Sequence, residues 1–237
     1  MAKDSGQDGA GKFRLNTVSR ELLVAVSGLV LVLFILVHLA GNLILFRGPD
    51  AFNAYSQHLH ELGLLLAAIR AGLIAAFVLH VVMTAWLVLA NRAARTTRYA
   101  VQRTMGNTNF VKQTMIYSGL LILVFVLLHL YDFTFIDKAG PYSVVEGRNT
   151  GQSLGLYGIV WNAFSNPLHS LLYIVAMAAL GLHFSNAVST IWVTLGVLSD
   201  AATAKANLAA RVLGAAIAVA FSAIPLYVLA MTHLRGV

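Results

Sequence analysis

The sequence predicts an all-α membrane protein with five transmembrane helices. Of its 237 residues, 59% are hydrophobic and only 11% are charged, a more apolar composition than that of ordinary soluble domains. The mean hydropathy is +0.78, and the apolar residues form continuous runs instead of alternating with polar ones, which favours helices over a closed β-barrel. We therefore expect lipid to surround most of the chain.

Five apolar segments are long enough to cross a hydrocarbon core of about 30 Å at about 1.5 Å per residue. They cover residues 21–46, 63–91, 112–136, 168–198 and 208–234. Residues 1–19 form a polar, basic N-terminal segment, and the apolar run after it is too long for a signal peptide and lacks a small-residue cleavage site. We expect residues 20–237 to form one transmembrane domain.

Lysine and arginine gather before the first apolar segment and in the connection between the second and third segments. Because such residues are retained on the cytoplasmic side, this predicts a cytoplasmic N-terminus and, after five crossings, a C-terminus on the outside. The connection 137–167 is the only long one, and its Gly, Pro, Ser and Asn content predicts an ordered loop with one short helix.

A short internal repeat relates the first and third segments. The sequence VSGLVLVLFILVHL, which contains Ser27, Gly28 and His38, is echoed by YSGLLILVFVLLHL, which contains Ser118, Gly119 and His129. In both, the serine precedes the histidine by about three helical turns and lies on the same face. We interpret the two helices as structurally equivalent, the alternative being a chance likeness between helices rich in leucine and valine.

Four consecutive segments each carry one histidine in their interior, namely His38, His80, His129 and His183. Ionisable side chains inside a membrane are costly and usually functional. Counted from the outer ends of the helices, His38 and His129 lie about 12–13 Å below the outer surface and His80 and His183 about 26–28 Å below it. The depth given for His183 requires the fourth helix to project beyond the inner surface of the membrane.

Two imidazoles at one level on different helices can supply both axial ligands of a haem iron. We therefore predict that four of the five helices form a haem-binding bundle, with His38 and His129 on an outer b haem and His80 and His183 on an inner one. The Ser-Gly pairs would make room for the inner haem. The alternative is that each histidine is a hydrogen-bonded core residue.

The chain has no cysteine, which excludes covalent c-type haem, iron–sulfur clusters bound by thiolates and disulfides. If protein histidines fill both axial positions, neither iron has an open site for oxygen or substrate, so the predicted task is electron transfer. No acidic residue falls near the bilayer centre, and we expect protons to exchange with the nearer aqueous side.

Polar residues near the outer surface are candidates for a second site. Arg70 lies about 13 Å inside the second segment, where it would pair with a haem propionate or a quinone-site group, or else snorkel outward. A quinone site needs hydrogen-bonding groups beside an apolar slot. The densest set is Asn53, Tyr55, Gln57, His58, His60 and Glu61, of which Tyr55, His60 and Glu61 are the candidates. We assign His58, His60, His169 and His233 interfacial positions without metal ligation.

The chain resembles the diheme cytochrome b membrane anchor of succinate:quinone and fumarate:quinol oxidoreductases, the type in which one chain of five helices holds both haems. The segments that carry the resemblance are SGLVLVLFILVHLAGNL (from Ser27), FNAYSQHLHELG (from Phe52), IRAGLIAAFVLH (from Ile69), NRAAR (from Asn91), LLHLYDF (from Leu127) and NPLHSLLYIVAMAALGLHFSNAVSTIWVTLG (from Asn166). Asn186 departs from the pattern, since many relatives carry another histidine there.

The resemblance implies the same four histidine ligands, menaquinone or ubiquinone as the quinone, and a place in the bacterial cytoplasmic membrane. It also implies a flavoprotein subunit and an iron–sulfur subunit as partners, with no nucleic acid. The chain would be the quinone-reactive subunit of an enzyme complex and would carry out no dicarboxylate chemistry itself. Two alternatives stay open: a cytochrome b anchor of a hydrogenase or formate dehydrogenase, and a transporter or proton channel with a histidine relay and no haem.

Overall fold

The structure is a computed structural model that describes residues 17–94, 108–146, 151–194 and 200–235. Within these ranges five helices are long and apolar enough to cross a membrane. They are α1 (Thr17–Leu43), α3 (Leu64–Ala93), α4 (Thr108–Phe133), α6 (Pro167–Thr194) and α7 (Asp200–Arg235). The described residues contain no strand, only an isolated bridge between Val144 and Ser153. The predicted all-α membrane class with five spanning helices is confirmed.

The helix boundaries differ from the prediction by up to about two turns. The last helix begins at Asp200, about two turns before the predicted start at residue 208, because alanine and lysine are good helix formers although they do not add to an apolar run. The third spanning helix ends at Phe133 instead of residue 136, where the backbone N–H groups of Thr134 and Phe135 both donate to the Leu130 carbonyl. The predicted residues 195–198 of the fourth span lie outside the described residues.

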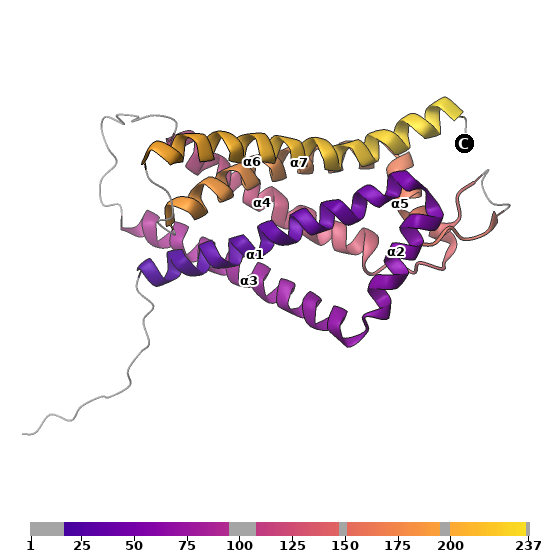
Figure 1. The fold of residues 1–237 in the computed structure, drawn as a ribbon, viewed down its shortest axis with the longest axis horizontal. Coiled ribbons are helices and arrows are strands. Elements are labelled where there is room, and N and C mark those ends of the chain that lie inside the picture. The colour runs from indigo at the N-terminus through magenta and orange to yellow at the C-terminus, as the bar shows by residue number, and fades with distance from the viewer. Residues whose placement is uncertain (1–16, 95–107, 147–150, 195–199, 236–237) are drawn as a thin grey trace, which may run out of the picture.

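The five long helices run roughly along one axis, and the shorter elements gather at one end of the bundle (Figure 1). Helix α6 packs along α7, α1 packs against α3 and α6, and α4 packs against α6. Helices α1 and α3 diverge toward the end where α2 (Pro49–Glu61) connects them. At the opposite end, the Arg20 guanidinium lies 3.3 Å from the centre of the Trp86 ring and joins α1 to α3 through a cation–π contact.

The described residues of the connection between α4 and α6 include the helices η2 (Pro141–Ser143) and α5 (Gly155–Ser165). Its order comes from hydrogen bonds made by Asn162, whose side-chain amide donates to the carbonyls of Tyr142 and Val144 at 2.9 and 2.7 Å. The prediction of an ordered loop with a short helix is confirmed. Helix α2 was not predicted, although Pro49 at its start and Asp50 in its first turn are typical helix-initiating residues.

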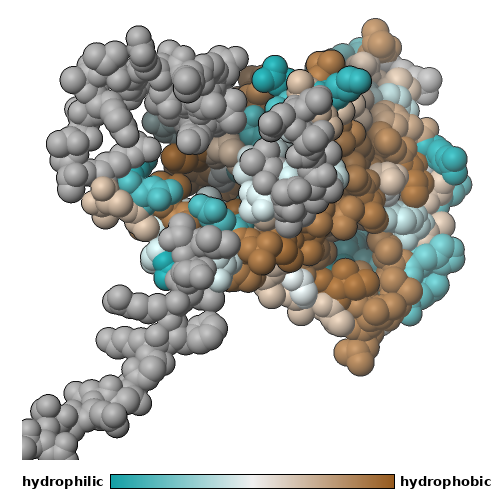
Figure 2. Space-filling model, turned by 60° about the vertical axis from the view of Figure 1, so that its left-hand side comes forward, coloured by the Kyte–Doolittle hydropathy of each residue, from teal (hydrophilic) through white to brown (hydrophobic). Residues whose placement is uncertain are grey.

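A hydrophobic cluster of buried residues lies at the end of the bundle where α2 and α5 are. Its centre is Trp161 of α5, which is 2% exposed and packs with Phe52 of α2 and Val228 of α7. Along the spanning helices, by contrast, apolar side chains point outward, and Figure 2 shows them covering much of one face. This distribution fits a bundle in lipid with a packed cap outside the hydrocarbon.

Asn53 fixes α2 to α5 in this cap. Its side-chain nitrogen donates to the Leu154 carbonyl at 2.8 Å, and its side-chain oxygen accepts from the Tyr157 N–H at 3.1 Å. Gly155 follows with a φ of 58°, a left-handed conformation that favours glycine. Asn53 therefore holds the cap together, although the sequence placed it among the polar groups of a quinone site.

Candidate functional site

The structure brings together the imidazole rings of His38 on α1 and His129 on α4. Their centroids are 5.7 Å apart and their planes are perpendicular. Aromatic rings surround both: Phe34 and Phe221 contact His38, and Phe125, Phe133 and Tyr173 contact His129. The two histidines thus face each other in an apolar, aromatic environment.

The spacing of this pair fits a metal ion between the two rings. Imidazoles that bind one metal ion from opposite sides, with about 2 Å from each nitrogen to the metal, have ring centroids about 6 Å apart. In addition, Nδ1 of His129 is buried and has no hydrogen-bond partner among the described residues. A buried polar atom without a partner is costly, and a ligand held at this ring would remove that cost.

His80 on α3 lies against the first Ser-Gly pair. Its Nδ1 is 3.3 Å from the Ser27 hydroxyl oxygen, and its Cε1 is 3.4 Å from where a Cβ atom on Gly28 would stand. The Ser27 hydroxyl itself donates to the Leu23 carbonyl, one turn earlier, at 2.7 Å. Because Gly28 has no side chain, the His80 ring reaches the surface of α1, where Ser27 contacts its Nδ1.

His183 on α6 repeats this arrangement at the second Ser-Gly pair. Its Nδ1 is 3.1 Å from the Ser118 hydroxyl oxygen, and its Cε1 is 3.2 Å from where a Cβ atom on Gly119 would stand. The Ser118 hydroxyl donates to the Thr114 carbonyl at 2.5 Å. The two halves of the sequence repeat thus hold two histidines in the same way.

These contacts determine which ring nitrogen is free. A serine hydroxyl has one hydrogen, and in Ser27 and Ser118 a backbone carbonyl already accepts it, so each oxygen is left to accept from the histidine. Each Nδ1 therefore carries the proton, and each Nε2 keeps a lone pair that can bind a metal.

The four histidines lie at two levels of the bundle. Ser27 is about 16 Å along α1 from His38, because the separation is about three turns, and the second repeat gives the same separation on α4. His80 and His183 contact the serines, so they share a level about three turns away from the His38 and His129 rings.

No protein-family model, curated protein or solved structure matches this chain. Functional assignment therefore depends on the chemistry of the histidines. Within the described ranges, no group of three or more His, Cys, Asp or Glu side chains comes together as a metal site. Haem suits such a chain, because the porphyrin supplies four of the six ligands and the protein needs to supply only two imidazoles. The His38 and His129 rings have a spacing that suits one such group, and His80 and His183 each present one further imidazole.

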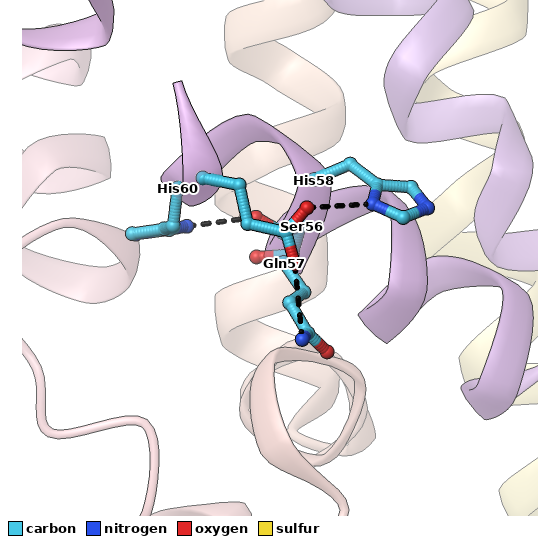
Figure 3. A network of polar contacts seen from close by, with 5 residues as sticks. Ser56, Gln57, His58 and His60 are labelled. Carbon is cyan, nitrogen blue, oxygen red and sulfur yellow. Dashed lines mark hydrogen bonds and ion pairs between the residues drawn. The ribbon is translucent and has the colours of Figure 1, made fainter. Parts of the chain in front are cut away.

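The polar side chains of α2 form an exposed network. The Glu61 carboxylate lies 3.1 Å from His58 Nδ1 and accepts from the Gln57 amide at 3.2 Å. His60 Nδ1 donates to the Ser56 carbonyl at 2.7 Å, and Figure 3 shows its ring pointing away from that of His58. The hydrogen bond from His58 lowers the pKa of Glu61 below the ordinary value of a carboxyl group.

Replacing His58 with alanine is expected to raise the pKa of Glu61 toward its ordinary value. The stabilising contact is present at pH values above the ordinary carboxyl pKa and is lost as the pH falls through the lowered one. A carboxyl-carbon NMR titration in detergent micelles would measure the change. His60→Ala is the matched control, since His60 bonds to the Ser56 carbonyl instead. An unchanged Glu61 pKa in the His58→Ala variant would show that the contact with His58 does not lower it.

The structure separates Tyr55 from the other two candidates for a quinone site. Tyr55 packs against the backbone of α1 at Gly41, where its hydroxyl leaves no space for a Cβ atom. His60, on another side of α2, accepts from the Lys138 ammonium at 3.4 Å. Arg70 is exposed, and its charge adds to the effect of burial in lowering the pKa of Lys138. Tyr55 and His60 therefore contact different parts of the chain.

Sequence reasoning missed a polar cluster beside the outer histidine pair. Asp132, one turn after His129 on α4, accepts a hydrogen bond from the Tyr173 hydroxyl at 2.6 Å. The same carboxylate oxygen lies 3.1 Å from Nε2 of His169, although the ring N–H is not aligned for a hydrogen bond. The available signal was the spacing of His169 and Tyr173, which lie one turn apart on one face of a helix.

Proposed function

We propose that this chain is a diheme cytochrome b that carries electrons through the membrane, as the anchor subunit of a succinate:quinone or fumarate:quinol oxidoreductase. The observations that support this most are the paired rings of His38 and His129 and the contacts of His80 and His183 with the serines of the two Ser-Gly pairs. Helix packing alone does not require two Ser-Gly pairs that each contact one imidazole, with the serine oxygen beside its Nδ1.

Each part of the chain would have a definite task. His38 and His129 would hold the outer haem, and His80 and His183 the inner one, with Ser27 and Ser118 fixing the orientation of the inner imidazoles. The aromatic rings around the outer pair exclude water. When bound, haem supplies one-electron transfer, with a potential set by its ligands and surroundings. Two such centres about 16 Å apart along the helices would form an electron path across the bilayer.

The partners and the orientation belong to the same proposal. An iron–sulfur subunit and a flavoprotein subunit would dock on the cytoplasmic face, and the electrons would pass to or from menaquinone or ubiquinone. The basic connection suited to such docking, residues 95–107, and most of the basic N-terminal segment lie outside the described residues. The five apolar helices support a multi-pass protein in a lipid bilayer, which we propose to be a bacterial cytoplasmic membrane with the C-terminus outside.

The reduced-minus-oxidised absorbance spectrum of the purified full-length chain tests this proposal. We expect b-type haem bands and two haems per chain by pyridine haemochrome assay. A colourless preparation from haem-sufficient cells would overturn the proposal in favour of a transporter with a histidine relay. Copurification separates the enzyme classes: succinate dehydrogenase activity supports our assignment, whereas hydrogenase or formate dehydrogenase activity in the copurifying subunits would contradict the choice of partner.

A further inference from the structure

Three side chains form a connected polar path from the outer histidine pair to the end of the bundle. The Tyr173 ring lies 6.3 Å from the His129 ring between centroids, and its hydroxyl donates to Asp132 at 2.6 Å. Asp132 in turn lies 3.1 Å from His169. Exposure rises along the path, from 5% for Tyr173 to 13% for the side chain of Asp132 and 25% for that of His169. Exposure along the path therefore increases toward His169.

The chemistry of the path suits proton exchange. A carboxylate and an imidazole are both groups that can carry a proton, and an imidazole can accept at one nitrogen and release at the other. His169 Nε2 is buried and faces Asp132, while the side chain as a whole is partly exposed. Protons can therefore reach the carboxylate through the imidazole.

Among the described residues, no charged side chain of α2 and no lysine is hydrogen-bonded or ion-paired to Asp132 or His169; Glu61, His58, His60 and Lys138 contact one another or the backbone instead. From α6 the pair is faced by Tyr173, and from α5 by the uncharged ring of Phe164, which contacts His169. From α7 the described titratable side chains at this end are Tyr227, which packs on Trp161, and His233, which is exposed. Among the described residues, Asp132 and His169 make no ion pair except with each other.

We propose that the Asp132–His169 pair takes up one proton from the outer aqueous phase when the outer centre accepts one electron, and releases it on oxidation. This inference rests on the proposed function, because it requires haem at His38 and His129. One electron reduces ferric to ferrous iron, and one proton forms an O–H or N–H bond on the pair, so the net charge of the site is unchanged. By linkage, protonation of the pair raises the potential of the outer haem.

The midpoint potential of the outer haem, titrated with a chemical reductant between about pH 5 and pH 8, tests the coupling. At full coupling it changes by about 59 mV for each tenfold change in proton concentration. We expect this dependence in the unmodified chain and its loss in Asp132→Asn and His169→Gln. The His233→Gln variant, altered at an exposed histidine at the same end, is expected to keep it.

The outcomes distinguish this inference from the function on which it rests. Absence of haem from the unmodified chain would overturn the proposed function. Two haems per chain together with an unchanged pH dependence in His169→Gln, the more exposed of the two positions, would overturn the inference alone. A second measurement needs no variant: reduction of the unmodified chain in weakly buffered detergent should remove protons from solution, as a pH-indicator dye would show, and no uptake would also overturn it.

Discussion

Replacing His129 with alanine is expected to reduce the haem content of the purified chain from two groups to one. The His38 and His129 rings face each other at 5.7 Å between centroids, so removal of either leaves the other without a partner across the metal. An iron centre with one missing axial imidazole would be lost or would open to solvent and external ligands. Pyridine haemochrome assays and low-temperature difference spectra would measure the loss, which should affect one spectral component.

His38→Ala should give the same result as His129→Ala, because the two residues serve one centre. His58→Ala is the matched control, since His58 is an exposed histidine that contacts Glu61 outside the spanning segments, and it should leave both haems in place. Equal loss of both spectral components in the His38 and His129 variants, with normal expression and helical content, would show that the pairing by level is wrong.

Much of the fold could be predicted from the sequence because lipid imposes a simple rule. A spanning helix must be long and continuously apolar, and hydropathy therefore located all five spanning helices. The rule does not apply outside the hydrocarbon. Helix α2 and the early start of α7 contain polar or small residues, so only Pro49, Asp50 and the alanine-rich run after Asp200 could have indicated them.

The site was predictable to the extent that helical geometry decides it. The depth of each histidine and the face shared by Ser27 and His38 follow from residue spacing along single helices. Contacts between helices depend on rotation and on side-chain direction, which spacing does not specify. For this reason the sequence indicated the Ser-Gly pairs but not their contact with Nδ1 of His80 and His183, and it gave no indication that Asp132 and His169 meet.

The second large expected effect concerns Gly119, the glycine of the Ser-Gly pair that His183 contacts. Replacing Gly119 with valine is expected to remove the inner haem while the outer haem is retained. A Cβ atom at Gly119 would already lie 3.2 Å from Cε1 of His183, closer than ordinary van der Waals contact, and the two methyl groups of valine would require still more space. The ring would leave the Ser118 oxygen, and its Nε2 would be displaced with it.

A series of substitutions separates the steric effect of this glycine from the hydrogen bond of the neighbouring serine. Ser118→Ala keeps the space but removes the hydrogen-bond acceptor of His183. Hydrogen-bond partners of metal-bound histidines typically contribute about 10–100-fold in metal affinity, so we expect weakened but detectable haem binding.

Gly72→Val is the matched control, since no atom lies within 4 Å of a Cβ placed on this α3 glycine. Haem content and the spectrum of the inner component should fall in the order Gly72→Val, Ser118→Ala, Gly119→Val. A His183 ring displaced from α4 could not keep its coordination of the iron. Full inner-haem content in Gly119→Val would therefore show that His183, placed against Ser118 and Gly119, binds no iron.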